Sequence, residues 1–151
     1  MKIVVDTNIV FSAILNTQSR IGQLLINGSK YFEFYTVGLL HDEIFAHKDK
    51  ILNLSKYSQD QFNEVLEIIS NRIVFIDDIL LNDNDFKEAV ELVSDIDPND
   101  ALFVALTNHL MANLWTGDKR LIIGLKKKGF SRILTTDEIY EIFLDKQLNN
   151  R

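Results

Sequence analysis

Short apolar runs alternate along this chain with stretches in which the apolar residues have helical spacing. Runs rich in β-branched and aromatic residues predict strands at residues 2–5, 32–37, 73–76, 113–116 and 133–134. Between them, apolar residues spaced three and four apart predict helices. Strands that alternate with helices are typical of a parallel sheet covered on both faces. We therefore predict an α/β fold, a three-layer α/β/α sandwich, formed by a single domain over residues 1–151.

The first half of the chain carries several helix signals. A helix is expected from about residue 9, and another at 21–26, between Ser19 and Gly28. Residues 39–54 have a helical pattern with a break near residues 47–49. Ser58 and Gln61 form a capping-box pattern that predicts the start of the next helix.

The second half continues the same alternation. Asp97 and Pro98 predict another helix start, with proline in the first turn. Residues 101–106 are apolar nearly all round, which predicts a central, buried helix. Further helices are expected at 119–127 and from about residue 137. A helix is also expected after the third strand, and its apolar face is made of Phe86, Ala89, Val90 and Val93.

Composition narrows the possible chemistry. The 151 residues are 46% hydrophobic and include no cysteine, which excludes disulfides, thiolate zinc sites and a cysteine nucleophile. The first apolar run, residues 3–5, is too short for a signal peptide or a membrane span. We expect a cytoplasmic protein with no membrane association.

The net charge of −6 argues mildly against nucleic-acid binding, but one stretch is basic. Between residues 119 and 132 there are six basic residues and no acid. The candidate RNA-binding residues are Lys119, Arg120, Lys126, Lys127 and Lys128. The ordinary alternative for the last three is a solvated helix end that interacts with the helix dipole.

Acidic residues follow the ends of several predicted elements. Asp6 follows the first strand and Asp118 the fourth, Asp97 and Asp100 open the buried helix, and Glu43 follows the second strand. Ligand sites in parallel α/β sheets form outside the carboxyl ends of the strands. Each acid alone is readily explained as a helix cap or a solvated residue. Together they predict a carboxylate site for a hard divalent cation, with the chemistry of metal-assisted phosphodiester hydrolysis.

Three motifs, in order, resemble those of PIN-domain nucleases, the family that includes VapC-like toxin ribonucleases. They are Ile-Val-Val-Asp-Thr-Asn at 3–8, Asp-Pro-Asn-Asp-Ala at 97–101 and Trp-Thr-Gly-Asp-Lys-Arg-Leu at 115–121. The resemblance spans essentially the whole chain. It implies a five-stranded parallel sheet and an Mg²⁺- or Mn²⁺-dependent endoribonuclease that cleaves single-stranded RNA by metal-activated water.

The resemblance also implies roles for individual residues. It makes Asp6, Asp100 and Asp118 the metal ligands, and Glu43 a further catalytic acid, with neighbouring Asp42 as the alternative. Supporting positions, which orient the ligands, are Asn8 and Thr116, with Asp97 as an extra acid.

Many small members of this family are toxins of toxin–antitoxin pairs, so the expected partners are RNA, an antitoxin protein and a second copy of the chain. The stretch 53–85 is longer here than in compact toxins. Two alternatives stay open. One is a phosphatase with Asp6 as nucleophile, although that class has a second aspartate where Asn8 stands. The other is a non-catalytic RNA-binding or protein-interaction module on the same fold.

Overall fold

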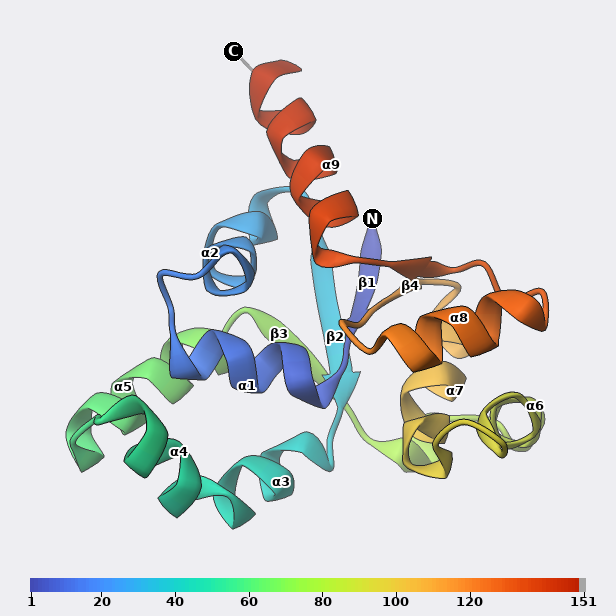
Figure 1. Cartoon of the computed structure of the whole chain (residues 1–151), viewed down its shortest axis with the longest axis horizontal. Coiled ribbons are helices and arrows are strands. Elements are labelled where there is room, and N and C mark those ends of the chain that lie inside the picture. The colour runs from blue at the N-terminus through green and yellow to red at the C-terminus, as the bar shows by residue number, and fades with distance from the viewer. Residues whose placement is uncertain (150–151) are drawn as a thin grey trace.

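A computed structural model describes residues 1–149 of the chain and shows a central five-stranded sheet (Figure 1). Every neighbouring pair of strands is parallel, and the strand order is β3-β2-β1-β4-β5. The strands are β1 (Lys2–Val5), β2 (Glu33–Val37), β3 (Ile73–Ile76), β4 (Asn113–Trp115) and β5 (Ile133–Leu134). The α/β prediction and the parallel sheet are confirmed, and the predicted strand bounds differ from these by at most one residue.

β1 lies in the middle of the sheet because its side chains are apolar on both faces. Ile3, Val4 and Val5 are all fully buried. An uninterrupted apolar run is typical of a strand covered on both sides, and a strand with one wet face would alternate instead. Burial on both faces therefore places the end of β1, and with it Asp6, near the centre of the molecule.

Two groups of helices cover the sheet (Figure 1). The first group connects β1 to β2 and β2 to β3: α1 (Thr7–Leu15), α2 (Arg20–Asn27), α3 (Leu40–Ala46), α4 (Lys48–Ser55) and α5 (Gln59–Ser70). The second follows β3 and β4 on the opposite face: α6 (Asp83–Val93), α7 (Ala101–Leu110) and α8 (Lys119–Lys127). The last helix, α9 (Thr136–Asn149), packs against α2 and then projects away from the body of the protein.

Local sequence signals explain most of the helix ends. Ser58 caps α5, and the reciprocal bond from the Ser58 backbone to the Gln61 side chain completes the capping box. The helical stretch predicted at 39–54 does break, at His47, into α3 and α4. Helix α1 begins at Thr7, two residues earlier than expected, because the Asp6 side chain caps it.

The central helix α7 is buried as predicted, since Val104, Ala105 and Leu106 have no exposed surface. Its start is a separate 3₁₀ turn, Pro98–Asp100, and the α-helix itself follows. Along α6 the expected apolar face is only half correct. Ala89 and Val93 are fully buried, whereas Phe86 and Val90 are 42% and 40% exposed.

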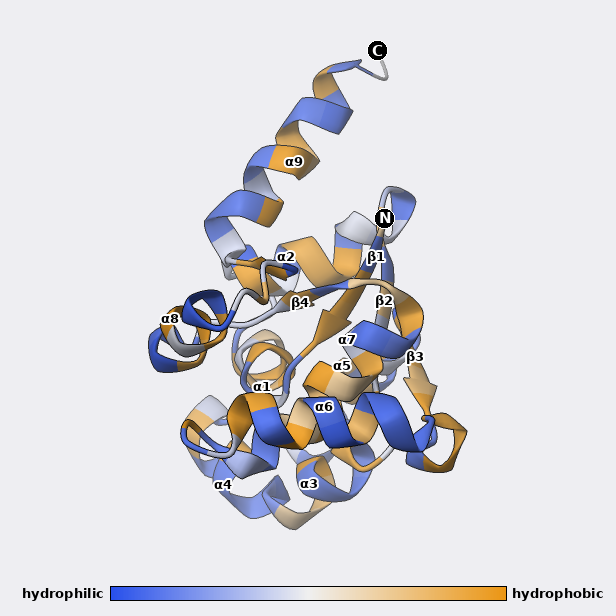
Figure 2. Ribbon diagram, turned by 90° about the vertical axis from the view of Figure 1, so that its right-hand side faces the viewer, coloured by the Kyte–Doolittle hydropathy of each residue, from blue (hydrophilic) through white to orange (hydrophobic). Residues whose placement is uncertain are grey.

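The hydropathy of the ribbon agrees with this layering (Figure 2). Hydrophobic residues concentrate on the strands and on α7, and the outer helix α6 is mixed. Across residues 1–149, no helix is long and apolar enough to span a lipid bilayer.

Candidate active site

Two of the predicted acids follow neighbouring strands at the same edge of the sheet. Val5 at the end of β1 pairs with Trp115 at the end of β4, and the backbone N–H of Asp6 donates to the Trp115 carbonyl at 3.3 Å. β1 and β4 are also where the strand order reverses direction, since the chain proceeds from β1 to β2 on one side and to β4 on the other. In parallel α/β sheets this switch point is where ligands bind.

Asp6 is a buried carboxylate with only 5% of its surface exposed. Its Oδ1 atom accepts the backbone N–H of Ile9 at 3.0 Å and so caps α1. Burial raises the pKa of Asp6, and the negative charge of Asp118 raises it further. Hydrogen bonds from Thr116 and from the backbone of Ile9 and Asn8 oppose that rise without cancelling it.

Asp118 caps α8 in a similar way. Its Oδ1 atom accepts the backbone N–H groups of Arg120 at 3.0 Å and Leu121 at 3.2 Å. In both Asp6 and Asp118 the cap uses Oδ1. Helix capping and cation binding are therefore compatible at these residues, because a carboxylate has a second oxygen and further lone pairs.

Asp100 belongs to the same electrostatic site. It ends the 3₁₀ turn before α7 and is half-buried. Burial, followed by the charges of Asp97, Asp6 and Asp118, raises the pKa of Asp100 to about 7. The structure thus brings Asp6, Asp100 and Asp118 within electrostatic range of one another, from three separate segments of the chain.

Thr116 connects two of these acids. It is fully buried, its hydroxyl oxygen accepts the backbone N–H of Asp118 at 3.1 Å, and a hydrogen bond from Thr116 lowers the pKa of Asp6. One hydroxyl group therefore contacts both Asp6 and Asp118 and helps to fix their positions relative to each other. The role of Thr116 in orienting ligands of a cation stays a prediction.

Glu43 faces the same cavity as Asp100. The cavity has a volume of about 530 Å³ and lies between α3 and the start of α7. The hydroxyl group of Thr7 donates to Oε2 of Glu43 at 3.1 Å, so Thr7, which sequence reasoning did not single out, steadies this acid. Asp42 is not among the residues that line the cavity, and of the two candidate acids the geometry favours Glu43.

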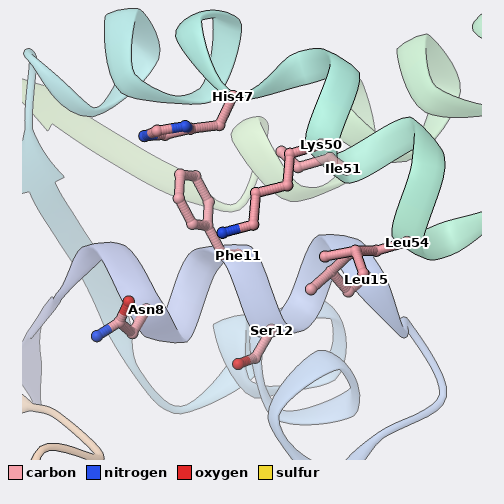
Figure 3. Close-up of a pocket in the computed structure, with 8 residues that line it drawn as sticks. All are labelled: Asn8, Phe11, Ser12, Leu15, His47, Lys50, Ile51 and Leu54. Carbon is pink, nitrogen blue, oxygen red and sulfur yellow. The ribbon is translucent and has the colours of Figure 1, made fainter.

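The two remaining positions expected to support the site, Asp97 and Asn8, have different surroundings. The Asp97 side chain accepts the backbone N–H of Asn99 at 3.0 Å, and its charge contributes to the high pKa of Asp100. Asn8 does not line the cavity of Asp100 and Glu43. It lines another cavity, of about 430 Å³, between α1 and α4 (Figure 3).

The basic residues are divided along α8. Lys119 and Arg120 are exposed at its start, next to Asp118. Lys126 and Lys127 are exposed in the last turn. Lys128 donates to the Leu92 carbonyl at 2.7 Å and pairs with Asp95, whose pKa this contact lowers. Lys128 thus connects the end of α8 to the last turn of α6 and to the segment that follows it, a role that its sequence context did not reveal.

The chemistry of the acids fits a hard divalent cation. All the candidate ligands are carboxylates, and a cation would relieve both the burial and the repulsion that raise the pKa values of Asp6 and Asp100. Within residues 1–149, no three acidic, histidine or cysteine side chains are gathered tightly enough to form a ready-made metal site.

Comparison with known proteins agrees with this architecture. The PIN domain family model matches residues 4–140. A chain in the crystal structure of VapBC2 from Rickettsia felis, bound to a DNA fragment from their promoter, is structurally similar, with a TM-score of 0.62. The similarity covers 89% of this chain and 98% of that one at 20% sequence identity, a level that shows a shared fold. None of the curated proteins compared matches the sequence.

The burial of Asp100 and the acidic groups around it predict a pH-dependent gain in stability from Asp100→Asn. The carboxyl pKa is about 7 in the folded protein and near the ordinary 3.8 in the unfolded chain, so the folded state holds the proton to higher pH. The wild type therefore loses stability relative to the variant as pH rises from about 4 to 7. Above pH 7 the variant should be more stable by about 1–2 kcal/mol, allowing for solvent screening at this half-buried site.

Urea denaturation in the presence of EDTA, at several pH values between 5 and 8, measures this difference. Asp145→Asn, at an exposed position on α9, is the matched control and should show no such trend. An Asp100→Asn variant less stable than the wild type at pH 8 would show that the carboxylate supports the fold rather than straining it.

Proposed function

Because the chain belongs to the PIN-domain family, we propose that it is a metal-dependent endoribonuclease that cleaves single-stranded RNA. The observation that carries this proposal is the electrostatic coupling of Asp6, Asp100 and Asp118 at the carboxyl edge of the sheet. Mutually repelling, partly buried carboxylates are costly in a protein without a cation, and their arrangement suits one.

In this proposal each residue of the site has a definite task. Asp6, Asp100 and Asp118 hold Mg²⁺ or Mn²⁺, with Glu43 at the edge of the site, held by Thr7. Thr116 forms hydrogen bonds with both Asp6 and Asp118 and so fixes their relative positions. When bound, the cation supplies Lewis-acid chemistry that polarises a phosphoryl oxygen and lowers the pKa of water.

The phosphatase alternative finds less support in the geometry. It needs a second acid two residues after Asp6, and the side chain at that position, Asn8, lines the cavity between α1 and α4 (Figure 3). A non-catalytic binding module on the same fold differs from the proposed nuclease in one measurable property, which is metal-dependent cleavage.

The partner proposal rests on the groove between α1 and α4. We propose that the protein is the toxin of a toxin–antitoxin pair and that an antitoxin segment covers this groove. Its lining is largely apolar, and it includes Leu54, which is 60% exposed, and the basic Lys50 (Figure 3). An amphipathic segment with apolar side chains and an acidic residue opposite Lys50 would complement it.

Substitution of the acids by asparagine gives the sharpest test of catalysis. Asparagine caps helices as well as aspartate does, so Asp118→Asn should keep the start of α8 while it removes a charged ligand. Cleavage of single-stranded RNA in Mn²⁺ should fall by about a hundredfold or more, with thermal stability in EDTA unchanged or slightly higher.

Asp6→Asn should behave alike, and Asp145→Asn on α9 should cleave as the wild type does. Chelation should abolish wild-type cleavage, and added Mn²⁺ should restore it. Full activity of Asp118→Asn at saturating Mn²⁺ would reduce Asp118 to a helix cap, and a wild type that binds RNA without cleaving it would favour the non-catalytic module.

The position of the basic residues predicts which of them guide RNA. Lys119 and Arg120 follow Asp118 directly, whereas seven further residues of helix carry Lys126 about 10 Å away from Lys119. The double variant Lys119→Gln/Arg120→Gln should weaken RNA binding and flatten its salt dependence, since phosphate contacts release counterions. Turnover at saturating RNA should change much less.

Lys126→Gln/Lys127→Gln is the comparison variant, with Lys128 left in place because it pairs with Asp95. Its effect on the dissociation constant should be the smaller of the two. Equal salt slopes for the wild type and both double variants, measured by fluorescence anisotropy, would mean that RNA approaches from another side.

The antitoxin proposal predicts that Leu54→Glu prevents formation of the complex while RNA cleavage by the isolated protein stays at the wild-type level. The substitution places a carboxylate in an apolar groove, and Leu54 lies outside the acid site. Co-expression and co-purification with a candidate antitoxin, followed by light scattering, measures the complex and also shows whether it contains two copies of this chain. A Leu54→Glu variant that still forms the complex would place the antitoxin elsewhere.

A further inference from the structure

The cavity that holds Asp100 and Glu43 has an apolar side. Its walls include Leu39 from the β2–α3 connection, Leu102 and Phe103 from α7, and Phe86 from α6. Leu39 and Phe86 are large apolar residues, yet they are 46% and 42% exposed. Exposed apolar surface that adjoins a cavity is characteristic of ligand-binding grooves. The site therefore combines acidic groups with an accessible apolar wall.

Phe86 also lines a second hollow, of about 370 Å³, which shares Leu102 with the first. Its remaining walls come from the segment between β3 and α6, including Ile79 and Leu81, and from Asp83 at the start of α6. The middle of this segment is apolar and lies at the surface, since Ile79 is 81% and Leu80 is 61% exposed. The ring of Phe86 thus stands between two adjoining hollows at the carboxyl edge of the sheet.

The helix does not need Phe86 in order to pack. Ala89 and Val93 of α6 are fully buried and anchor it. A phosphate group would gain little beside Phe86, because the surroundings are apolar and the second hollow is bordered by the carboxylates of Asp78 and Asp83. A nucleobase suits the place better, since its flat π-face stacks on an aromatic ring whatever its sequence identity.

We propose that Phe86 is a stacking platform for one unpaired nucleobase of the RNA, next to the phosphate that the acids engage, with Leu39 and Leu102 as neighbouring walls. The inference rests on the proposed ribonuclease activity and specifies its substrate. A base that is paired within an A-form helix cannot turn its face to Phe86. The platform therefore selects single-stranded RNA over duplex.

The test compares Phe86→Ala with two other variants. Phe86→Trp retains a stacking surface, and Val90→Ala is the matched control, because Val90 is 40% exposed one turn further along α6 and lines neither hollow. The substrates are a single-stranded RNA oligonucleotide with one mapped cleavage site and a series with a single abasic nucleotide at each position beside that site.

Phe86→Ala should raise KM for the intact oligonucleotide by roughly 5- to 140-fold, the range of one base–aromatic stack. At one abasic position the wild type and Phe86→Ala should have the same KM, because the stacked base is already missing. Phe86→Trp should restore KM and its indole fluorescence should be quenched by RNA, since Trp115, the other tryptophan, is fully buried. Val90→Ala should match the wild type.

If the wild type cleaves RNA and Phe86→Ala has unchanged KM, the platform is refuted and the ribonuclease proposal stands. An equal loss on the intact oligonucleotide and on every abasic one also refutes it, because the effect then does not depend on a base. A wild type that neither cleaves nor binds RNA overturns both proposals together.

Discussion

The pairing of β1 with β4 is the constraint on which the rest of the site depends. The two strands meet at the centre of the sheet, where their apolar side chains are buried on both faces, and their ends are joined by the bond from Asp6 N–H to the Trp115 carbonyl. This contact places Asp6, which follows β1, near Thr116 and Asp118, which follow β4. Thr116 then connects Asp6 with Asp118, and the start of α7 adds Asp100.

The acids at this point serve the fold and also strain it. Asp6 and Asp118 begin α1 and α8 by capping them, which stabilises the helix starts. Burial raises the pKa of Asp100 to about 7, together with the charges of Asp97, Asp6 and Asp118, so desolvation and repulsion both act on this carboxyl group. A protein without a site to maintain could cap the same helices with serine or asparagine and avoid the repulsion. Local strain of this kind is expected where function, rather than stability, determines the residues.

The helix that Asp6 caps links the two surfaces that we propose to be functional. The start of α1 lies at the acids, and its further turns line the groove against α4, with Asn8 and Phe11 on that wall (Figure 3). A protein bound in the groove would contact the same rigid helix that positions Asp6. The apolar wall around Phe86 lies on the other side of Asp100, toward α6. RNA and a protein partner would thus approach the acids from different helices.

The sequence by itself determined the elements of this protein, and the tertiary structure decided which of them meet. The strands, the capping box at Ser58 and the acids after the strand ends are local patterns, so periodicity and helix-start signals predicted them. Strand order is a long-range property that these patterns do not give. The grouping of Asp6, Asp100 and Asp118 was predicted from their places after strand ends and at a helix start, and the resemblance to PIN-domain nucleases pointed to the same set. The orientation of Glu43 rather than Asp42 into the cavity, the contact of Lys128 with Asp95 and the exposure of Phe86 depend on neighbours distant in the chain. Hydrophobic periodicity cannot report them, because it describes which face of an element is apolar and not what covers that face.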